Sequence, residues 1–123
     1  MASVSVIIPS RKETFLNRTI QDIQEKFKGD FEIIVVLDGG WAEPLDGVKY
    51  IYNKEAKGMR TAINQGVAKA KGKYIIKLDA HCMVDEGVDE KLKAVHLDNW
   101  IQAPRRKRFD PNRWELTDLD TPD

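Results

Sequence analysis

The amino-acid sequence predicts an α/β domain built on a largely parallel sheet. Apolar segments of strand length alternate with helical patterns in the order strand, helix, strand, strand, helix, strand. The strand segments are continuous apolar runs rich in β-branched residues, which is typical of strands buried on both faces. Several of these runs stop at a polar or glycine-rich cluster, where ligands of parallel sheets bind.

The first part of the chain predicts two strands with a helix between them. Residues 4–9 form the first apolar run, and Ser10 and Glu13 after it have the spacing of a capping box. The following apolar positions share one helical face as far as residue 27. A second run, residues 33–37, stops at Asp38-Gly39-Gly40, which is a strong turn signal.

The second part of the chain repeats this alternation with shorter elements. We expect two more strands, of which the later one is buried, then a third helix around Val88, Leu92 and Val95 and a last short strand. In chain order, the expected segments are a strand at 48–52, a helix at 58–70, a buried strand at 74–78, the third helix and a strand at 100–103.

Composition excludes several classes of protein. The 123 residues predict one domain, and 20 Lys and Arg balance 20 Asp and Glu, which argues against a general nucleic-acid binder. Cys82 is the one cysteine, so no intramolecular disulfide can form, and we expect it to be a small, partly buried residue. No apolar run is long enough to span a membrane and no signal peptide is evident, so we expect a cytoplasmic protein.

Three polar clusters, at 9–11, 38–40 and 79–81, follow predicted strands and should converge on one crevice. Asp79 and His81 are two residues apart and project to the same side of an extended chain. A carboxylate and an imidazole together suit a divalent cation, with diphosphate oxygens and water completing its coordination. The alternative is that Asp79 caps a turn and His81 is a hydrogen-bonded loop residue.

Four segments of the chain form a recognisable combination. They are Val-Ser-Val-Ile-Ile-Pro at 4–9 followed by Glu13, the strand and turn at 32–40, the glycine-opened helix at 58–66, and the strand and loop at 71–81. Together they resemble glycosyltransferase family 2 and its GT-A relatives over roughly residues 4 to 104. The Asp-x-His sequence in place of Asp-x-Asp is most similar to that of the polypeptide N-acetylgalactosaminyltransferases.

This resemblance implies a GT-A, Rossmann-like, three-layer α/β/α fold with a mostly parallel sheet, truncated to its nucleotide-binding half. It implies a hexosyl- or N-acetylhexosaminyltransferase that takes a UDP-sugar with Mn²⁺ or Mg²⁺ and an unknown protein or glycan as acceptor. Asp79 and His81 would hold the metal, Asp38 would accept a hydrogen bond from uracil, and Arg60 would meet the diphosphate. The residues expected to bind the nucleotide-sugar are Pro9, Ser10, Arg11, Glu13, Asp38, Gly58, Arg60, Asp79 and Ala80.

The sequence departs from the family pattern at three points. Leu37 replaces the first Asp of the usual pair, and Ile63 stands where many relatives have Arg. The third departure is length, since the acceptor half of the family's catalytic domain has no counterpart, so no catalytic base is assigned. We place the nucleotide-binding half-domain at 1–104 and a basic, then acidic, segment at 105–123, which we expect to be poorly ordered.

Other interpretations stay open. Asp38 has a sufficient local role as the first residue of a hairpin-like turn, and Glu13 as the capping-box partner of Ser10. A truncated or degenerate module that binds nucleotide-sugar without transfer is the main functional alternative. A dinucleotide or phosphate-loop protein is disfavoured because the loop at 10–13 lacks glycine. An uncovered sheet face favours homo-oligomerisation.

Overall fold

The computed structural model describes residues 3–94, 107–110 and 112–120. Four parallel strands form a sheet in the order β3-β2-β1-β4, so β1 and β2 are central. The parallel sheet predicted from the sequence is confirmed. The elements in chain order are β1 (Val4–Ser10), α1 (Leu16–Lys26), β2 (Phe31–Asp38), β3 (Val48–Asn53), α2 (Met59–Lys69), β4 (Tyr74–Lys77), α3 (Val88–Ala94), β5 (Lys107–Asp110) and β6 (Glu115–Asp120).

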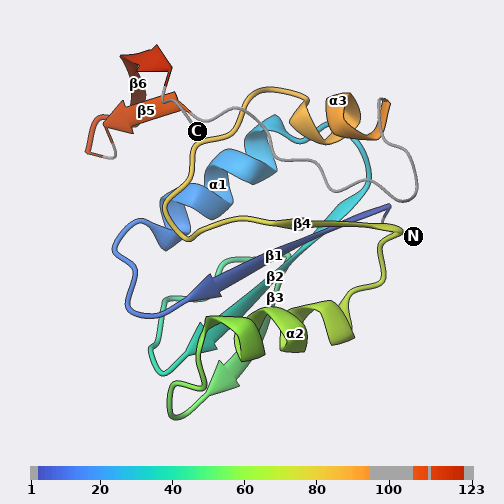
Figure 1. Cartoon of the computed structure of the whole chain (residues 1–123), viewed down its shortest axis with the longest axis vertical. Coiled ribbons are helices and arrows are strands. Elements are labelled where there is room, and N and C mark those ends of the chain that lie inside the picture. The colour runs from blue at the N-terminus through green and yellow to red at the C-terminus, as the bar shows by residue number, and fades with distance from the viewer. Residues whose placement is uncertain (1–2, 95–106, 111, 121–123) are drawn as a thin grey trace.

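The helices cover both faces of the sheet and give three layers (Figure 1). α1 and α3 lie on one side, and α2 lies on the other. The main apolar core joins α1 to the sheet face that carries Val6, Ile8 and Val35. Burial of this face supplies most of the driving force for the α1 layer, since each buried aliphatic side chain contributes roughly 1.5–3 kcal/mol.

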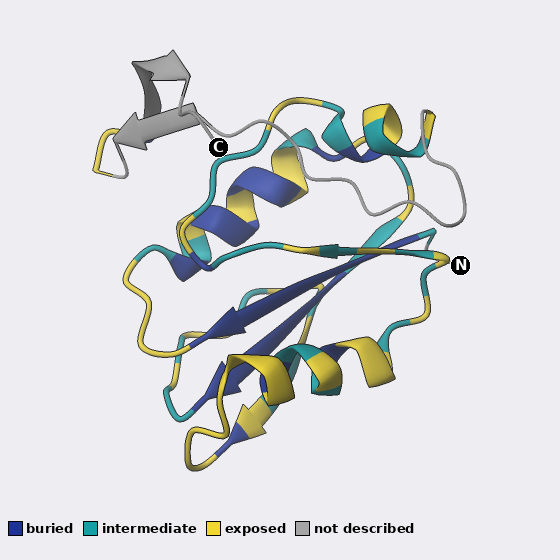
Figure 2. Cartoon of the chain, viewed as in Figure 1, coloured by how far each residue is buried: buried dark blue, intermediate teal, exposed yellow. Residues whose placement is uncertain are grey.

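The two central strands are buried along most of their length, whereas the two outer strands are half exposed (Figure 2). In β4, half-buried and exposed residues alternate, and the Ile75 side chain is exposed. The expectation that residues 74–78 form a buried strand was therefore wrong. An apolar run does not by itself reveal whether the strand is central or lies at a sheet edge.

The predicted capping box does not form. Ser10 is buried as the last residue of β1, and α1 begins only at Leu16, with no side-chain hydrogen bond at its N-cap, Phe15. Ser10 therefore continues the strand, and Glu13 lies in the loop between strand and helix. The local-cap interpretation of Glu13 is excluded by this geometry.

The connection from β2 to β3 is a crossover that contains no helix. The two strands are parallel, so Asp38 does not begin a hairpin. Residues 39–47 run beside α1, where Asn17 Nδ2 donates to Glu43 O (3.2 Å) and Gln24 Nε2 donates to Asp46 O (3.3 Å). Two polar side chains on α1 thus hold the crossover against the helix.

α2 approaches the other sheet face most closely at Gly66. A Cβ atom at this position would lie 2.5 Å from Cγ2 of Ile7 and 3.5 Å from Cγ2 of Val36. Glycine is therefore required here by the packing of helix on sheet, not by its backbone conformation. This contact fixes how deeply the second helical layer sits.

The C-terminal segment contains a hairpin that the sequence pattern did not predict. β5 pairs antiparallel with β6, and Trp114 in the turn between them is buried, with Arg18 of α1 lying 5.2 Å from its ring centroid. The predicted strand at 100–103 and the first two residues of the basic segment, 105–106, lie outside the described residues.

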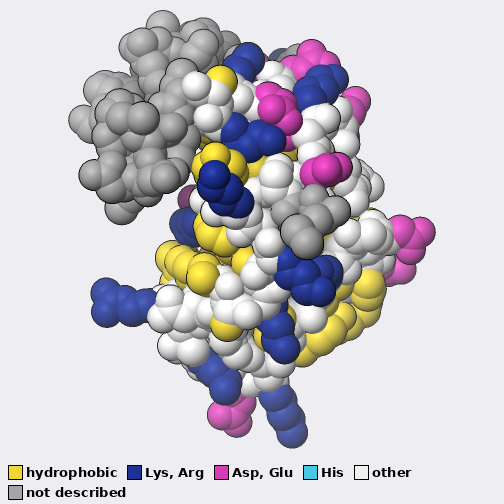
Figure 3. Space-filling model, turned by 90° about the vertical axis from the view of Figure 1, so that its right-hand side faces the viewer, with side chains coloured by type: hydrophobic (Ala, Val, Ile, Leu, Met, Phe, Trp, Pro, Cys, Tyr) yellow, Lys and Arg dark blue, Asp and Glu magenta, His cyan; other side chains and the backbone are white. Residues whose placement is uncertain are grey.

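Charge and hydropathy on the described surface agree with the balanced composition. On the face shown in Figure 3, Lys and Arg side chains are separated by acidic, apolar and uncharged groups and form no continuous basic patch. No described helix is both long enough and apolar enough to cross a bilayer.

Candidate functional site

The loops at the carboxyl ends of the strands meet at one edge of the sheet, as the sequence predicted. The turn after β2 lies between its two neighbours, since a Cβ on Gly39 would lie 2.9 Å from Ala56 N and one on Gly40 would lie 3.0 Å from Lys12 N. The loop after β1 also reaches the loop after β4, because Glu13 Oε1 lies 3.5 Å from His81 Nδ1. Segments from four strands therefore form one site.

Asp38, the last residue of β2, organises the loop that leads into α2. Its side chain is 5% exposed, and Oδ1 accepts hydrogen bonds from Asn53 Nδ2 (2.9 Å) and Lys57 N (2.8 Å). Oδ2 accepts a hydrogen bond from Gly58 N (3.0 Å). Burial raises the pKa of Asp38, but these three donors and the charge of Arg11 outweigh it, so the pKa lies below the usual value of 3.8. Asp38 is therefore ionised at neutral pH.

A pair of amide side chains extends this network into α2, and sequence reasoning missed both. Asn53 Nδ2 donates to Gln65 Oε1 (2.7 Å), and Gln65 Nε2 donates to Asn53 Oδ1 (3.0 Å). Asn53 is buried at the end of β3. The available signal was a polar residue that ends an apolar strand, in the same way as Asp38. Asn53 and Gln65 connect β3, β2 and α2 at this edge.

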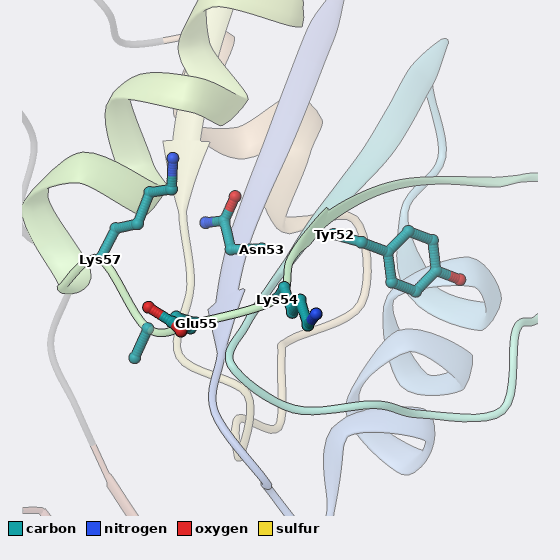
Figure 4. A pocket seen from close by; sticks show the side chains of 6 residues that line it. Tyr52, Asn53, Lys54, Glu55 and Lys57 are labelled. Atoms are coloured by element: carbon teal, nitrogen blue, oxygen red, sulfur yellow. The ribbon is translucent and has the colours of Figure 1, made fainter.

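A shallow hollow of about 390 Å³ lies beside this network, lined by residues 52–57. Figure 4 shows that the Tyr52 ring points away from Lys57, which stands next to the first turn of α2. Gly58, with φ +100°, lets the chain turn from the hollow into the helix. Arg60 lies exposed on α2 and lines a neighbouring hollow with Met59, Ile63 and Asn64.

Asp79 and His81 lie in the loop after β4 and are accessible. Their side chains are 47% and 56% exposed. Lys77 Nζ lies 2.5 Å from Asp79 Oδ1, and the Glu13 carboxylate faces Nδ1 of His81. Asp79 thus has an ion-pair partner at the end of β4, and His81 has a carboxylate neighbour from the loop after β1. The interpretation of Glu13 as a nucleoside-pocket residue stays a prediction.

The remaining predicted residues take different positions at this edge. Pro9 and Ser10 are buried as the end of β1, and Arg11 is exposed beside them. Ala80 is 1% exposed and packs into the core, so its side chain does not face solvent. Any contact between Ala80 and a ligand is therefore limited to backbone atoms.

Two polar residues of α1, Thr19 and Asp22, hold the loop after β4, and the sequence analysis did not identify them. Thr19 Oγ1 donates to Ala80 O (3.2 Å) and accepts from Cys82 N (3.1 Å). Asp22 Oδ2 accepts from Val84 N (2.8 Å). Both interrupt the apolar face of α1 in the sequence, which was the available signal.

Cys82, next to this site, lies in surroundings that disfavour its thiolate form. Burial raises the pKa of its thiol above the usual value, and the negative charge of Asp79 raises it further. The neutral thiol therefore dominates at pH 7, and a nucleophilic role is disfavoured.

The donor chemistry of Asp79 and His81 fits a hard or borderline divalent cation, because one carboxylate and one imidazole are accessible in the same loop. Within the part of the chain that the structure describes, no group of three or more His, Cys, Asp or Glu side chains is arranged to hold a metal. The described residues thus supply two candidate ligands, Asp79 and His81, and further ligands would have to complete the coordination of a cation.

Comparisons with known proteins agree with this architecture. The family model described as glycosyl transferase family 2 matches residues 5–119 and so reaches into β6. A Drosophila melanogaster protein named putative polypeptide N-acetylgalactosaminyltransferase 13 is 32% identical over 113 residues, covering 74% of this chain and 20% of its own. A Rickettsia bellii uncharacterized glycosyltransferase is 34% identical over 112 residues, covering 81% of this chain and 16% of its own.

Solved structures support the same fold. The crystal structure of S. aureus TarS 1–349 superposes with a TM-score of 0.66 at 18% identity, over 76% of this chain and 32% of that one. This likeness confirms the predicted GT-A, Rossmann-like α/β fold. The chain spans about a fifth of the length of the curated relatives that it matches. With the family model matching most of its length, the chain belongs to glycosyl transferase family 2.

Proposed function

We propose that this chain binds the donor of a glycosyl transfer, a UDP-sugar, together with a divalent cation, and takes part in transferring the sugar to a protein or glycan acceptor. The observation that carries the proposal is the meeting of four strand-end loops at one edge of the sheet. There Asp38, which is ionised, ends β2, and the accessible pair Asp79 and His81 follows β4. Family membership supplies the transferase class.

In this proposal the nucleoside lies against the loop between β3 and α2. Asp38 accepts three hydrogen bonds from the protein and so fixes the shape of that loop. Oδ2 accepts only one of these bonds and keeps capacity for another, which suits an N–H of a uracil ring. Base recognition then depends on a carboxylate that the fold holds charged and immobile before the ligand arrives.

Asp79 and His81 would hold Mn²⁺ or Mg²⁺, which when bound offsets the negative charge that develops on a departing diphosphate. Glu13 faces Nδ1 of His81 and so favours a proton on that nitrogen, which leaves Nε2 as the free donor atom. Arg11 and Arg60 are exposed at the same edge and provide positive charge for the phosphates. When the cation binds, it would replace Lys77 as the ionic partner of Asp79.

Calorimetric titration of the chain with UDP, with and without Mn²⁺, tests the donor-binding proposal. We expect UDP to bind measurably tighter in the presence of Mn²⁺, and ADP to bind more weakly than UDP under the same conditions. Failure to detect metal-dependent binding at millimolar UDP would count against the proposal. A chelator added after binding should reverse the gain in affinity.

A second candidate function is a module that binds the nucleotide-sugar without transferring the sugar. It is favoured by the donor-side roles of all residues assigned above. Release of UDP from a panel of UDP-sugars, measured with acceptor glycans and peptides, separates the two. Turnover at enzymatic rates would exclude the module, whereas binding without turnover would support it.

A further inference from the structure

Thr19 of α1 forms hydrogen bonds with the loop after β4 on both sides of His81. Its hydroxyl donates to the carbonyl of Ala80 and accepts from the N–H of Cys82, at 3.2 and 3.1 Å. Thr19 is fully buried, so water does not compete for these bonds. One side chain therefore satisfies both backbone groups that flank the histidine.

Asp22, almost one helical turn further along α1, also forms a hydrogen bond with the backbone of this loop. Its Oδ2 accepts from Val84 N at 2.8 Å, while Oδ1 lies 3.0 Å from Lys26 Nζ. Residues 19 and 22 lie on the same face of the helix. They hold backbone groups from residue 80 to residue 84, and the chain that leaves β4 passes beside the N-terminal end of α1 before rising to α3 (Figure 1).

Ala80 and Val84 anchor the loop by apolar contacts with the core, and these two α1 side chains supply hydrogen bonds that fix its backbone. Leu78 N donates to Ile7 O, the last sheet bond before the loop. In the described part of the chain, residues 79–84 make no backbone–backbone hydrogen bond outside regular elements. Hydrogen bonds from α1 side chains thus help to fix the path of the loop. A threonine in a helix usually bonds to a carbonyl of its own helix, whereas the hydroxyl of Thr19 bonds to this distant segment.

We propose that Thr19 is a positioning residue for the metal-binding pair Asp79 and His81, with Asp22 as its auxiliary. The proposal rests on the proposed function, because Thr19 would position the two metal ligands that the proposed function requires. The described residues offer two ligands, which alone bind a cation weakly, so the placement of these two side chains strongly affects the affinity. Loss of the Thr19 hydroxyl should therefore weaken cation binding and leave the metal-independent part of nucleotide binding intact.

The test compares Thr19→Val, which keeps the shape of the side chain but removes the hydroxyl, with Thr19→Ser, which keeps the hydroxyl. Mn²⁺ affinity in saturating UDP is measured from the free Mn²⁺ signal in electron paramagnetic resonance, and UDP affinity without metal by calorimetry. We expect Thr19→Val to lose at least tenfold in Mn²⁺ affinity with metal-free UDP affinity unchanged. Thr19→Ser should restore Mn²⁺ affinity to within about threefold of wild type.

Ile20→Val is the matched control, because it removes a buried methyl group from the neighbouring position on α1 and leaves the hydrogen bonds from Thr19 and Asp22 to the loop in place. It should keep wild-type Mn²⁺ affinity even if it lowers the melting temperature. If Thr19→Val does not fold, Thr19→Ala replaces it, since the vacated space admits a water that can bond Ala80 O and Cys82 N. Thr19→Ala should also lose Mn²⁺ affinity, because a water does not tie the loop to α1.

Unchanged Mn²⁺ affinity in a folded Thr19→Val or Thr19→Ala variant would overturn the positioning role and leave the proposed function standing. Equal losses in Thr19→Val and Ile20→Val would also overturn it, because they would indicate general destabilisation. A wild-type chain that binds UDP identically with and without Mn²⁺ would overturn the proposed function, and with it any role of Thr19 in metal binding. Faster hydrogen exchange of the Cys82 amide in Thr19→Val confirms that the bond seen here is the one removed.

Discussion

The carboxylate of Asp38, at the end of β2, accepts a hydrogen bond from the backbone N–H of Gly58, the residue that precedes α2. The distance from Gly58 N to Asp38 Oδ2 is 3.0 Å. The bond connects two segments that are 20 residues apart and sets the start of the helix relative to the sheet edge. Asp38 therefore has a structural task in addition to the base-reading role proposed for it. The two tasks are compatible, because the carboxylate is already charged and held in place.

Asp38→Asn is expected to lower the free energy of unfolding by about 2 kcal/mol, since one amide cannot replace a charged acceptor of three hydrogen bonds. Because the folded pKa of Asp38 is depressed, its contribution is present above the unfolded value of 3.8 and is lost as pH falls below it. Urea unfolding at pH 7 measures the loss. The exposed Asp46→Asn is the control and should change stability by less than about 0.5 kcal/mol. Equal effects from both variants would contradict the assignment.

Glu32 should make stability depend on pH in the acid range. Its carboxylate accepts from Ser5 Oγ, Lys49 Nζ and Lys71 N at 2.5, 2.7 and 2.7 Å. Burial raises the pKa of Glu32, but these bonds and the charge of Lys49 lower it to about 2 from 4.5. The depressed folded pKa means that this stability is fully present above about pH 4.5 and is lost as pH falls towards 2.

Chemical denaturation between pH 2 and 6 tests this contribution, which we place on the order of 2 kcal/mol after allowing for solvent screening. Glu32→Gln should be less stable than wild type at pH 6, and the difference should shrink as the pH approaches 2. A constant difference between the two proteins across this range would show that the charge of Glu32 is not the cause.

Gly66→Ala is expected to destabilise the protein by about 1 kcal/mol. The added Cβ would overlap Cγ2 of Ile7, and the overpacking cost of roughly 1–3 kcal/mol outweighs the gain of about 1 kcal/mol in helix propensity. Asn64→Ala on the exposed side of the same helix should stabilise by about 0.5 kcal/mol. Thermal unfolding of both variants measures these changes in stability, and a Gly66→Ala variant more stable than wild type would refute the close contact.

Cys82 should react slowly with a thiol reagent at pH 7. Burial and the nearby Asp79 charge raise the pKa of the thiol, so the reactive thiolate is scarce and its reaction rate should keep increasing up to a higher pH than for a free cysteine. The rate with dithionitrobenzoate, compared between native protein and protein unfolded in urea, measures this. A faster reaction in the native state would contradict the predicted environment.

The sequence was sufficient to predict the order of the elements from β1 to α3, because strand-length apolar runs and the 3.6-residue period of α2 are local signals. It also predicted that Asp38 lies near the loop after β1, since parallel strands bring their carboxyl ends to one edge. The exposure of Ile75 was not predictable, because it depends on which strand lies outermost. The hairpin at 107–120 has strands too short and charged to show a strand period.

The candidate site was only partly predictable for the same physical reason. Asp79, His81 and Asp38 follow strands and were visible as polar strand ends. Thr19 and the Asn53–Gln65 pair act through contacts across the fold, at sequence separations of 61 and 12 residues, which no local pattern encodes. The roles proposed for Arg11, Arg60 and the other ligand-facing residues stay predictions, as do homo-oligomerisation and a cytoplasmic location.

The most direct measurement is the affinity for UDP in manganese buffer of wild type, Asp79→Ala and His81→Ala, with Asp46→Asn as a control that removes one exposed charge elsewhere. We expect either alanine variant to lower the affinity at least tenfold, to the level that wild type shows with a chelator, and the control to match wild type. If both alanine variants bind UDP as tightly as wild type in the presence of Mn²⁺, these two side chains do not hold the cation.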